Sequence, residues 1–81
     1  MTISDSALIN TVRDILLQDS RTAGQTIDVI ASEGVIVLFG ACDEDDQAHV
    51  AVTLTEGLVG VKQVLDRITR RNVRVRKVAS A

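Results

Sequence analysis

Six cationic side chains lie close together near the end of this 81-residue chain, and they are the residues best suited to binding chemistry. They fall within eleven positions and are Arg67, Arg70, Arg71, Arg74, Arg76 and Lys77. Each Lys or Arg near an anionic lipid surface contributes about 1 kcal/mol, and the arginine fork suits phosphate oxygens. The pattern predicts a site for an anionic partner. A solubilising strand edge or a solvated tail explains it equally well.

The distribution of charge along the chain points the same way. Residues 1–58 contain ten acids and two bases, a net charge of −8, whereas residues 59–81 contain seven bases and one acid, a net charge of +6. Such asymmetry favours a charged partner or self-association between opposite ends. Phe39 is the single aromatic residue. The chain therefore has no platform for stacking bases, which together with its acidic majority argues against nucleic-acid binding.

Two further motifs have simpler structural explanations. The run Gly57-Leu58-Val59-Gly60 fits the Gly-x-x-Gly loop of KH nucleic-acid modules, but its apolar middle suits a helix stop followed by a turn. The acid cluster Asp43–Asp46 has oxygens that suit calcium or magnesium, yet it lacks the glycine and distal glutamate of an EF-hand loop. Acids at the positive start of a helix explain the cluster better.

Catalytic motifs are missing from the sequence. Cys42 and His49 would form a weak nucleophile–base pair, because no oxyanion-hole motif accompanies them, and they supply too few ligands for zinc. There is no Ser–His–Asp set, phosphate loop or dinucleotide fingerprint. We therefore predict a non-enzymatic protein without a metal or cofactor.

The first half of the chain has the periodicity of a helix followed by two strands. Ser4 is a good helix cap, and an apolar stripe at helical spacing predicts a helix over 5–18. Residues 26–31 alternate as in a strand, a tight turn follows at Gly34, and a second strand begins at Val35 and ends at Gly40. The two strands should form an antiparallel hairpin, with Ile36 and Leu38 toward the helices.

The second half predicts a helix and a third strand. Small residues give the helix a stripe that can sit close to a sheet, Gly57 and Gly60 end it, and a strand follows over 61–68. The predicted fold is α+β: one αββαβ domain whose three-stranded mixed sheet carries both helices on one face. The core spans about 4–68, and the basic extension 69–81 either prolongs the sheet or forms a tail.

These elements resemble those of the BON domain, a small module named from bacterial osmotically induced periplasmic and nodulation proteins. The resemblance rests on Gly34-Val35-Ile36-Val37-Leu38-Phe39-Gly40 and on Val59-Gly60-Val61-Lys62-Gln63-Val64-Leu65-Asp66. The turn glycines Gly34, Gly40 and Gly60 belong to this pattern. Asp66 stands where the family usually has Asn, and Phe39 where a small polar residue is usual; neither departure threatens the fold.

The resemblance implies a binding module of the cell envelope. Proposed partners in the family are phospholipid or membrane surfaces, and some members bind a small ligand, a cation or a protein. We therefore expect attachment to an anionic phospholipid surface through the basic segment. Protein–protein interaction or self-assembly is the alternative, with a strand edge near Val73 and Val75 pairing with another chain.

The sequence also bears on compartment. It has no apolar run of about 18 residues that could span a membrane. The first residues, Met1 to Asp5, lack the basic and apolar regions of a secretory signal. As given, the chain is expected in the cytoplasm, or in the periplasm if it is a processed form or an excised domain.

Overall fold

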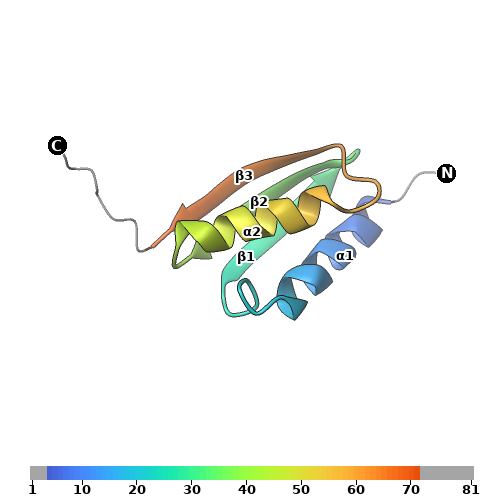
Figure 1. The fold of residues 1–81 in the computed structure, drawn as a ribbon. Helices are drawn as coiled ribbons and strands as arrows, with labels where there is room; N and C mark the ends of the chain where they lie inside the picture. Colours follow the sequence, from blue (N-terminus) through green and yellow to red (C-terminus); the bar gives the residue numbers. More distant parts are fainter. Residues whose placement is uncertain (1–3, 72–81) are drawn as a thin grey trace.

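A computed structural model describes residues 4–71 as two helices and a three-stranded sheet (Figure 1). The elements in chain order are α1 (Asp5–Gln18), β1 (Thr26–Ser32), β2 (Val35–Cys42), α2 (Asp45–Glu56) and β3 (Gln63–Arg70). β2 is the central strand, with β1 antiparallel to it on one side and β3 parallel on the other. The predicted α+β class, the order αββαβ and the mixed sheet are confirmed.

Helix α1 forms where its cap and apolar stripe predict. The Ser4 hydroxyl oxygen accepts a hydrogen bond from the Ala7 N–H at 3.1 Å, which satisfies one free amide of the first turn. The side chains of Leu8, Val12 and Leu16 are buried at helical spacing. Packing of this stripe holds the helix against the sheet.

Helix α2 begins with a capping box between the acid Glu44, its N-cap residue, and Gln47, so the acid cluster takes part in the start of this helix as predicted. The Gln47 side-chain oxygen accepts hydrogen bonds from the N–H groups of Asp43 and Glu44 at 3.0 and 2.9 Å. Its buried residues are the small Ala48, Ala51 and Thr55, and the Thr55 hydroxyl donates to the Ala51 carbonyl at 2.7 Å. Small side chains let this helix approach the sheet closely.

Both helices cover the same face of the sheet, and the hydrophobic core lies between these two layers (Figure 1). On the central strand Ile36, Leu38 and Cys42 are fully buried beneath the helices, as predicted for the first two. The other buried apolar residues come from all remaining elements: Leu8, Val12, Leu16, Val29, Ala48, Ala51 and Ile68. This aliphatic core is thin, as expected for a domain of this length.

The β1–β2 hairpin turns through two residues with positive φ. Glu33 has φ of 52° and Gly34 of 86°, and Ser32 pairs with Val35 on either side of them. This is the primed turn geometry that suits the right-handed twist of a hairpin. Gly60, with φ of 96°, likewise lies in the turn that precedes β3.

Gly40 does not end its strand, contrary to the sequence prediction. It pairs with Ile27, and β2 continues through Ala41 to Cys42. Its φ of 107° is open to glycine without strain, so the residue accommodates a close approach of β1 inside the sheet instead of a turn. The third strand begins at Gln63, two residues later than predicted, and ends at Arg70, so the start of the basic extension prolongs it, which is one of the two predicted arrangements.

The sheet face opposite the helices, which we call the open face, is uncovered by any described element. Side chains alternate along each strand, so this face carries the residues between the buried ones. At its centre the register aligns Ile30, Val37 and Leu65, and the next level aligns Asp28, Phe39 and Arg67. Ile30 is 53% exposed and Phe39 36% exposed. An apolar patch flanked by one acid and one base therefore faces solvent.

Candidate binding site at the end of strand β3

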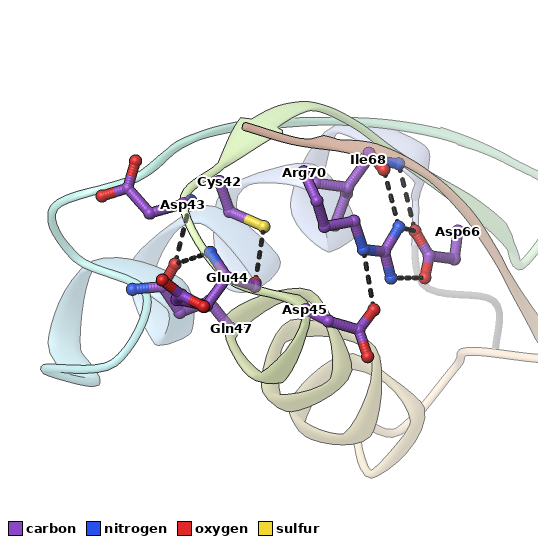
Figure 2. A network of polar contacts seen from close by, with 8 residues as sticks. All are labelled: Cys42, Asp43, Glu44, Asp45, Gln47, Asp66, Ile68 and Arg70. Atoms are coloured by element: carbon purple, nitrogen blue, oxygen red, sulfur yellow. Dashed lines mark hydrogen bonds and ion pairs between the residues drawn. The ribbon is translucent and has the colours of Figure 1, made fainter. Parts of the chain in front are cut away.

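Two residues of the basic segment, Arg70 and Arg71, meet the acid cluster where β3 ends. Cys42 pairs with Arg70 across the parallel strands β2 and β3. The chain leaving β2 enters the acid cluster directly, so these acids lie beside the end of β3. Figure 2 shows the Arg70 guanidinium between the carboxylates of Asp45 and Asp66.

Four hydrogen bonds hold the Arg70 guanidinium. Its Nε donates to Asp45 Oδ1 at 3.0 Å, and its Nη2 donates to Asp66 Oδ2 at 2.9 Å. Its Nη1 donates to the Ile68 carbonyl at 2.6 Å and to Asp66 Oδ1 at 3.3 Å. A guanidinium has five N–H donors, so one is left. With its side chain only 22% exposed, Arg70 cannot present a two-pronged fork to a phosphate without giving up these contacts.

Arg71 makes a looser contact with the same acidic loop. Its Nε donates to Asp43 Oδ1 at 3.1 Å, and its backbone N–H donates to the Cys42 carbonyl at 2.8 Å. Both side chains are about half exposed, 46% for Arg71 and 48% for Asp43. Exposed pairs of this kind contribute about 0–1 kcal/mol, so an anionic partner can compete for Arg71 at small cost.

The contacts of Arg70 also change the titration of its partner. Partial burial acts to raise the pKa of Asp66, but the Arg70 guanidinium and the Ile68 N–H, which donates at 3.0 Å, outweigh burial and hold the pKa below its ordinary 3.8. The hydrogen bond to Asp66 in turn raises the pKa of Arg70. Asp19 behaves alike: hydrogen bonds from Arg21 lower its pKa to about 2.

Acid should therefore weaken the folded state through Asp66 and Asp19. Because both pKa values are depressed by folding, the stabilisation is complete above the ordinary pKa and is lost as the pH falls from about 4 toward 2. Asp66→Asn should cost about 1.5 kcal/mol at neutral pH, which lowers Tm by roughly 6–12 °C. Its Tm should then change less than that of the wild type between about pH 5 and pH 2. Parallel Tm curves for the two proteins would contradict this assignment.

The remaining predicted anion-binding residues have different surroundings. Arg67 is exposed on the open face and forms no ion pair with any residue of 4–71. Arg74, Arg76 and Lys77 lie outside the described residues, as do Val73 and Val75. The structure thus brings Arg70 and Arg71 together with the acids and sets Arg67 apart from them.

Cys42 is held as a neutral thiol. It is fully buried, its Sγ donates to the Glu44 carbonyl at 3.1 Å, and burial raises its pKa. His49 is exposed on α2. A thiol with a raised pKa is a poor nucleophile and a poor metal ligand, so this cysteine acts as a core residue.

The described residues also bear on metal binding and on membrane spanning. Among residues 4–71, no group of three His, Cys, Asp or Glu side chains is arranged to hold a metal ion. None of the described helices has the length and apolar character needed to cross a bilayer. A hollow of about 170 Å³, small for a ligand pocket, opens between the end of α1 and the start of β1; it is lined by Arg13, Leu16, Leu17, Thr22, Gln25 and Ile27.

The sequence predicted a basic segment free of the acid cluster, and the pairing of Arg70 with Asp45 and of Arg71 with Asp43 counts against that prediction for these two arginines. The sequence analysis assigned the acids to the start of α2 and the arginines to a separate surface. The feature that could have predicted this contact is the parallel pairing of β2 with β3. In a parallel pair, the residues that follow each strand lie at the same edge of the sheet. Once that register places the two segments side by side, their opposite charges can pair.

Comparison with known protein families identifies the family of this chain. No curated protein matches the chain. The family model for the BON domain matches residues 4–72, which include every helix and strand described above. The chain therefore belongs to the BON domain family.

Proposed function

We propose that this BON domain is a non-enzymatic binding module that attaches to an anionic phospholipid surface through its basic residues between 67 and 77. The family is one of binding domains. The observation that carries the proposal is that six of the nine Lys and Arg residues fall within this segment. Attraction to anionic lipid grows with each such charge, and a continuous basic segment applies several charges to one surface.

The ion pairs divide the basic residues by role. Arg70 is already paired with Asp45 and Asp66. It therefore holds the end of β3 against α2 and does not contact lipid. Arg67 is exposed and Arg71 is half exposed, and both can meet head groups. Together with Arg74, Arg76 and Lys77 they supply the attraction. The acids near Arg70 oppose it, so binding should be moderate and sensitive to salt.

Removing the last three charges should weaken binding strongly. The triple variant R74Q/R76Q/K77Q is expected to bind vesicles rich in phosphatidylserine about a hundredfold less tightly, since each lost charge costs about 1 kcal/mol. Co-sedimentation with these vesicles at low and high salt measures the change. The matched control is R13Q/R21Q/K62Q, which removes three positive charges outside the segment and should change binding far less.

Three results would contradict the proposal. One is equal loss of binding in the two triple variants, which would indicate a response to net charge alone. Another is binding that ignores salt, and the third is binding to neutral phosphatidylcholine vesicles as tight as to anionic ones. Each would remove the charged segment from the mechanism.

A second candidate function is protein binding by strand addition. It is favoured by the position of β3, whose outer side is unpaired within the described sheet. An unpaired strand edge can bind an extended segment of another chain through main-chain hydrogen bonds. The predicted edge residues Val73 and Val75 lie outside the described residues. If Val75→Pro, which removes a backbone donor, left all protein association unchanged, this candidate would be excluded.

A further inference from the structure

The open face combines exposed apolar area with charge on two adjacent levels of the sheet. Its central level, Ile30, Val37 and Leu65, is apolar on all three strands. The adjacent level places Asp28 on β1, Phe39 on β2 and Arg67 on β3. Phe39 is the chain's only aromatic residue and lies between an acid and a base on the uncovered side.

We propose that the open face binds a second copy of this chain, in a face-to-face dimer whose two-fold axis runs along β2. A half-turn about such an axis exchanges the two edges of the sheet but does not move a residue along its strand. Asp28 of one copy then lies opposite Arg67 of the other, and the reverse pair forms as well. Phe39 meets Phe39, and Ile30 meets Leu65.

The arrangement of charges on the open face favours a second copy of this chain over other binding partners. A two-fold interface presents the same patch twice, so the patch must complement itself. The acid and base here lie on opposite edges at one level, which is the arrangement that a two-fold axis along the central strand requires. An anionic membrane would gain less from this face, because Asp28, which is 54% exposed at the rim of the apolar patch, opposes the attraction of Arg67.

The distances allow both ion pairs to form. Packed sheets lie about 10 Å apart and twist by about 30°, a gap that a facing Arg and Asp can bridge. Arg13 already donates to Asp28 Oδ1 at 3.1 Å, as does the Val29 N–H at 3.2 Å. Asp28 Oδ2 has no hydrogen-bond partner among residues 4–71 and can accept from Arg67 of the second copy.

The size of the face sets the strength of the dimer. Three strands of about eight residues give a face of roughly 26 by 14 Å, well below the 800 Å² that each partner of a stable complex buries. The dimer should be weak, dissociating at micromolar and forming at millimolar concentration. It does not depend on lipid binding, although Arg67 takes part in both.

A charge swap tests the dimer directly. Sedimentation equilibrium of the full chain from micromolar to millimolar concentration should show a monomer–dimer transition. D28R alone should raise the dissociation constant at least about tenfold, because two like charges then face two others. The double variant D28R/R67D restores opposite charges across the two-fold axis and should return the constant close to that of the wild type. Phe39→Ser should weaken the dimer at least about tenfold.

The controls separate this interface from general stickiness and from unfolding. Leu17→Ser removes another exposed apolar side chain, away from the open face and 66% exposed, and should leave the dimer unchanged. Circular dichroism and Tm report whether each variant folds. A monomer at all concentrations, or a dimer that persists in Phe39→Ser, overturns the proposal. The proposal is also overturned if the dimer of D28R/R67D has a dissociation constant as high as that of D28R. If the wild type stays monomeric and Phe39→Ser loses vesicle binding, the open face binds lipid and not a second copy.

Discussion

Gly40→Ala is expected to remove more than half of the stability of this domain. A Cβ at this position would overlap the carbonyl oxygen of Thr26 and lie 3.2 Å from its carbonyl carbon. Both atoms belong to the backbone of the paired strand, so neither can rotate away. The φ of 107° adds strain for any residue with a side chain. The overlap and the strain together should cost at least about 3 kcal/mol, against a total stability near 5 kcal/mol for a domain of this size.

Gly24→Ala is the matched control for this substitution. It adds the same methyl group, but nothing lies within 4 Å of the new atom, and Gly24 is not among the glycines with positive φ. Its stability should be unchanged or higher by about 0.5 kcal/mol, because the unfolded chain loses freedom. Urea denaturation followed by circular dichroism compares the two variants. If both lost stability equally, the close approach of β1 at Gly40 would be wrong.

Leu38→Ala should be the second most damaging substitution. Leu38 is fully buried on the central strand, beneath both helices, and a domain with so thin an aliphatic core can close the resulting cavity only partly. We expect a loss of about 3–4 kcal/mol in the free energy of unfolding. Chemical denaturation at micromolar concentration, where the proposed dimer is dissociated, gives this value directly.

Leu65→Ala makes the same chemical change on the opposite face of the sheet. Leu65 is half-buried on the open face, so its truncation in the monomer should cost about 1 kcal/mol or less. The difference between the two leucines tests which face the helices cover. Equal losses in dilute solution would contradict the assignment of the faces, whereas an effect of Leu65→Ala that appears only at high concentration would support the dimer.

The elements that the sequence predicted well are those governed by local chemistry. The bounds of α1 follow from the Ser4 cap and the apolar stripe, and the hairpin turn follows from Gly34. The end of β2 was misjudged because a glycine in a strand has two explanations, a stop or a close approach of another strand. Only the pairing of Gly40 with Ile27 distinguishes them.

The contacts at the end of β3 could not be predicted in the same way, because they depend on register between distant strands. Neither Asp45 nor Arg70 carries a local signal of its partner, 25 positions away. For the open face, the sequence indicated only that β2 carries apolar residues on both of its sides. Its alignment of Asp28, Phe39 and Arg67 emerges once all three strands are paired.

The parallel pairing of β3 with β2 has a consequence for the order in which the protein folds. Each β3 residue pairs with one 28 positions earlier, whereas the hairpin pairs close neighbours. Closing that long loop costs chain entropy that only later contacts repay. We therefore expect α1 and the hairpin to assemble early and the arrival of the last strand to limit the rate. A chain still being synthesised would hold its central strand half-paired until residue 70 was available.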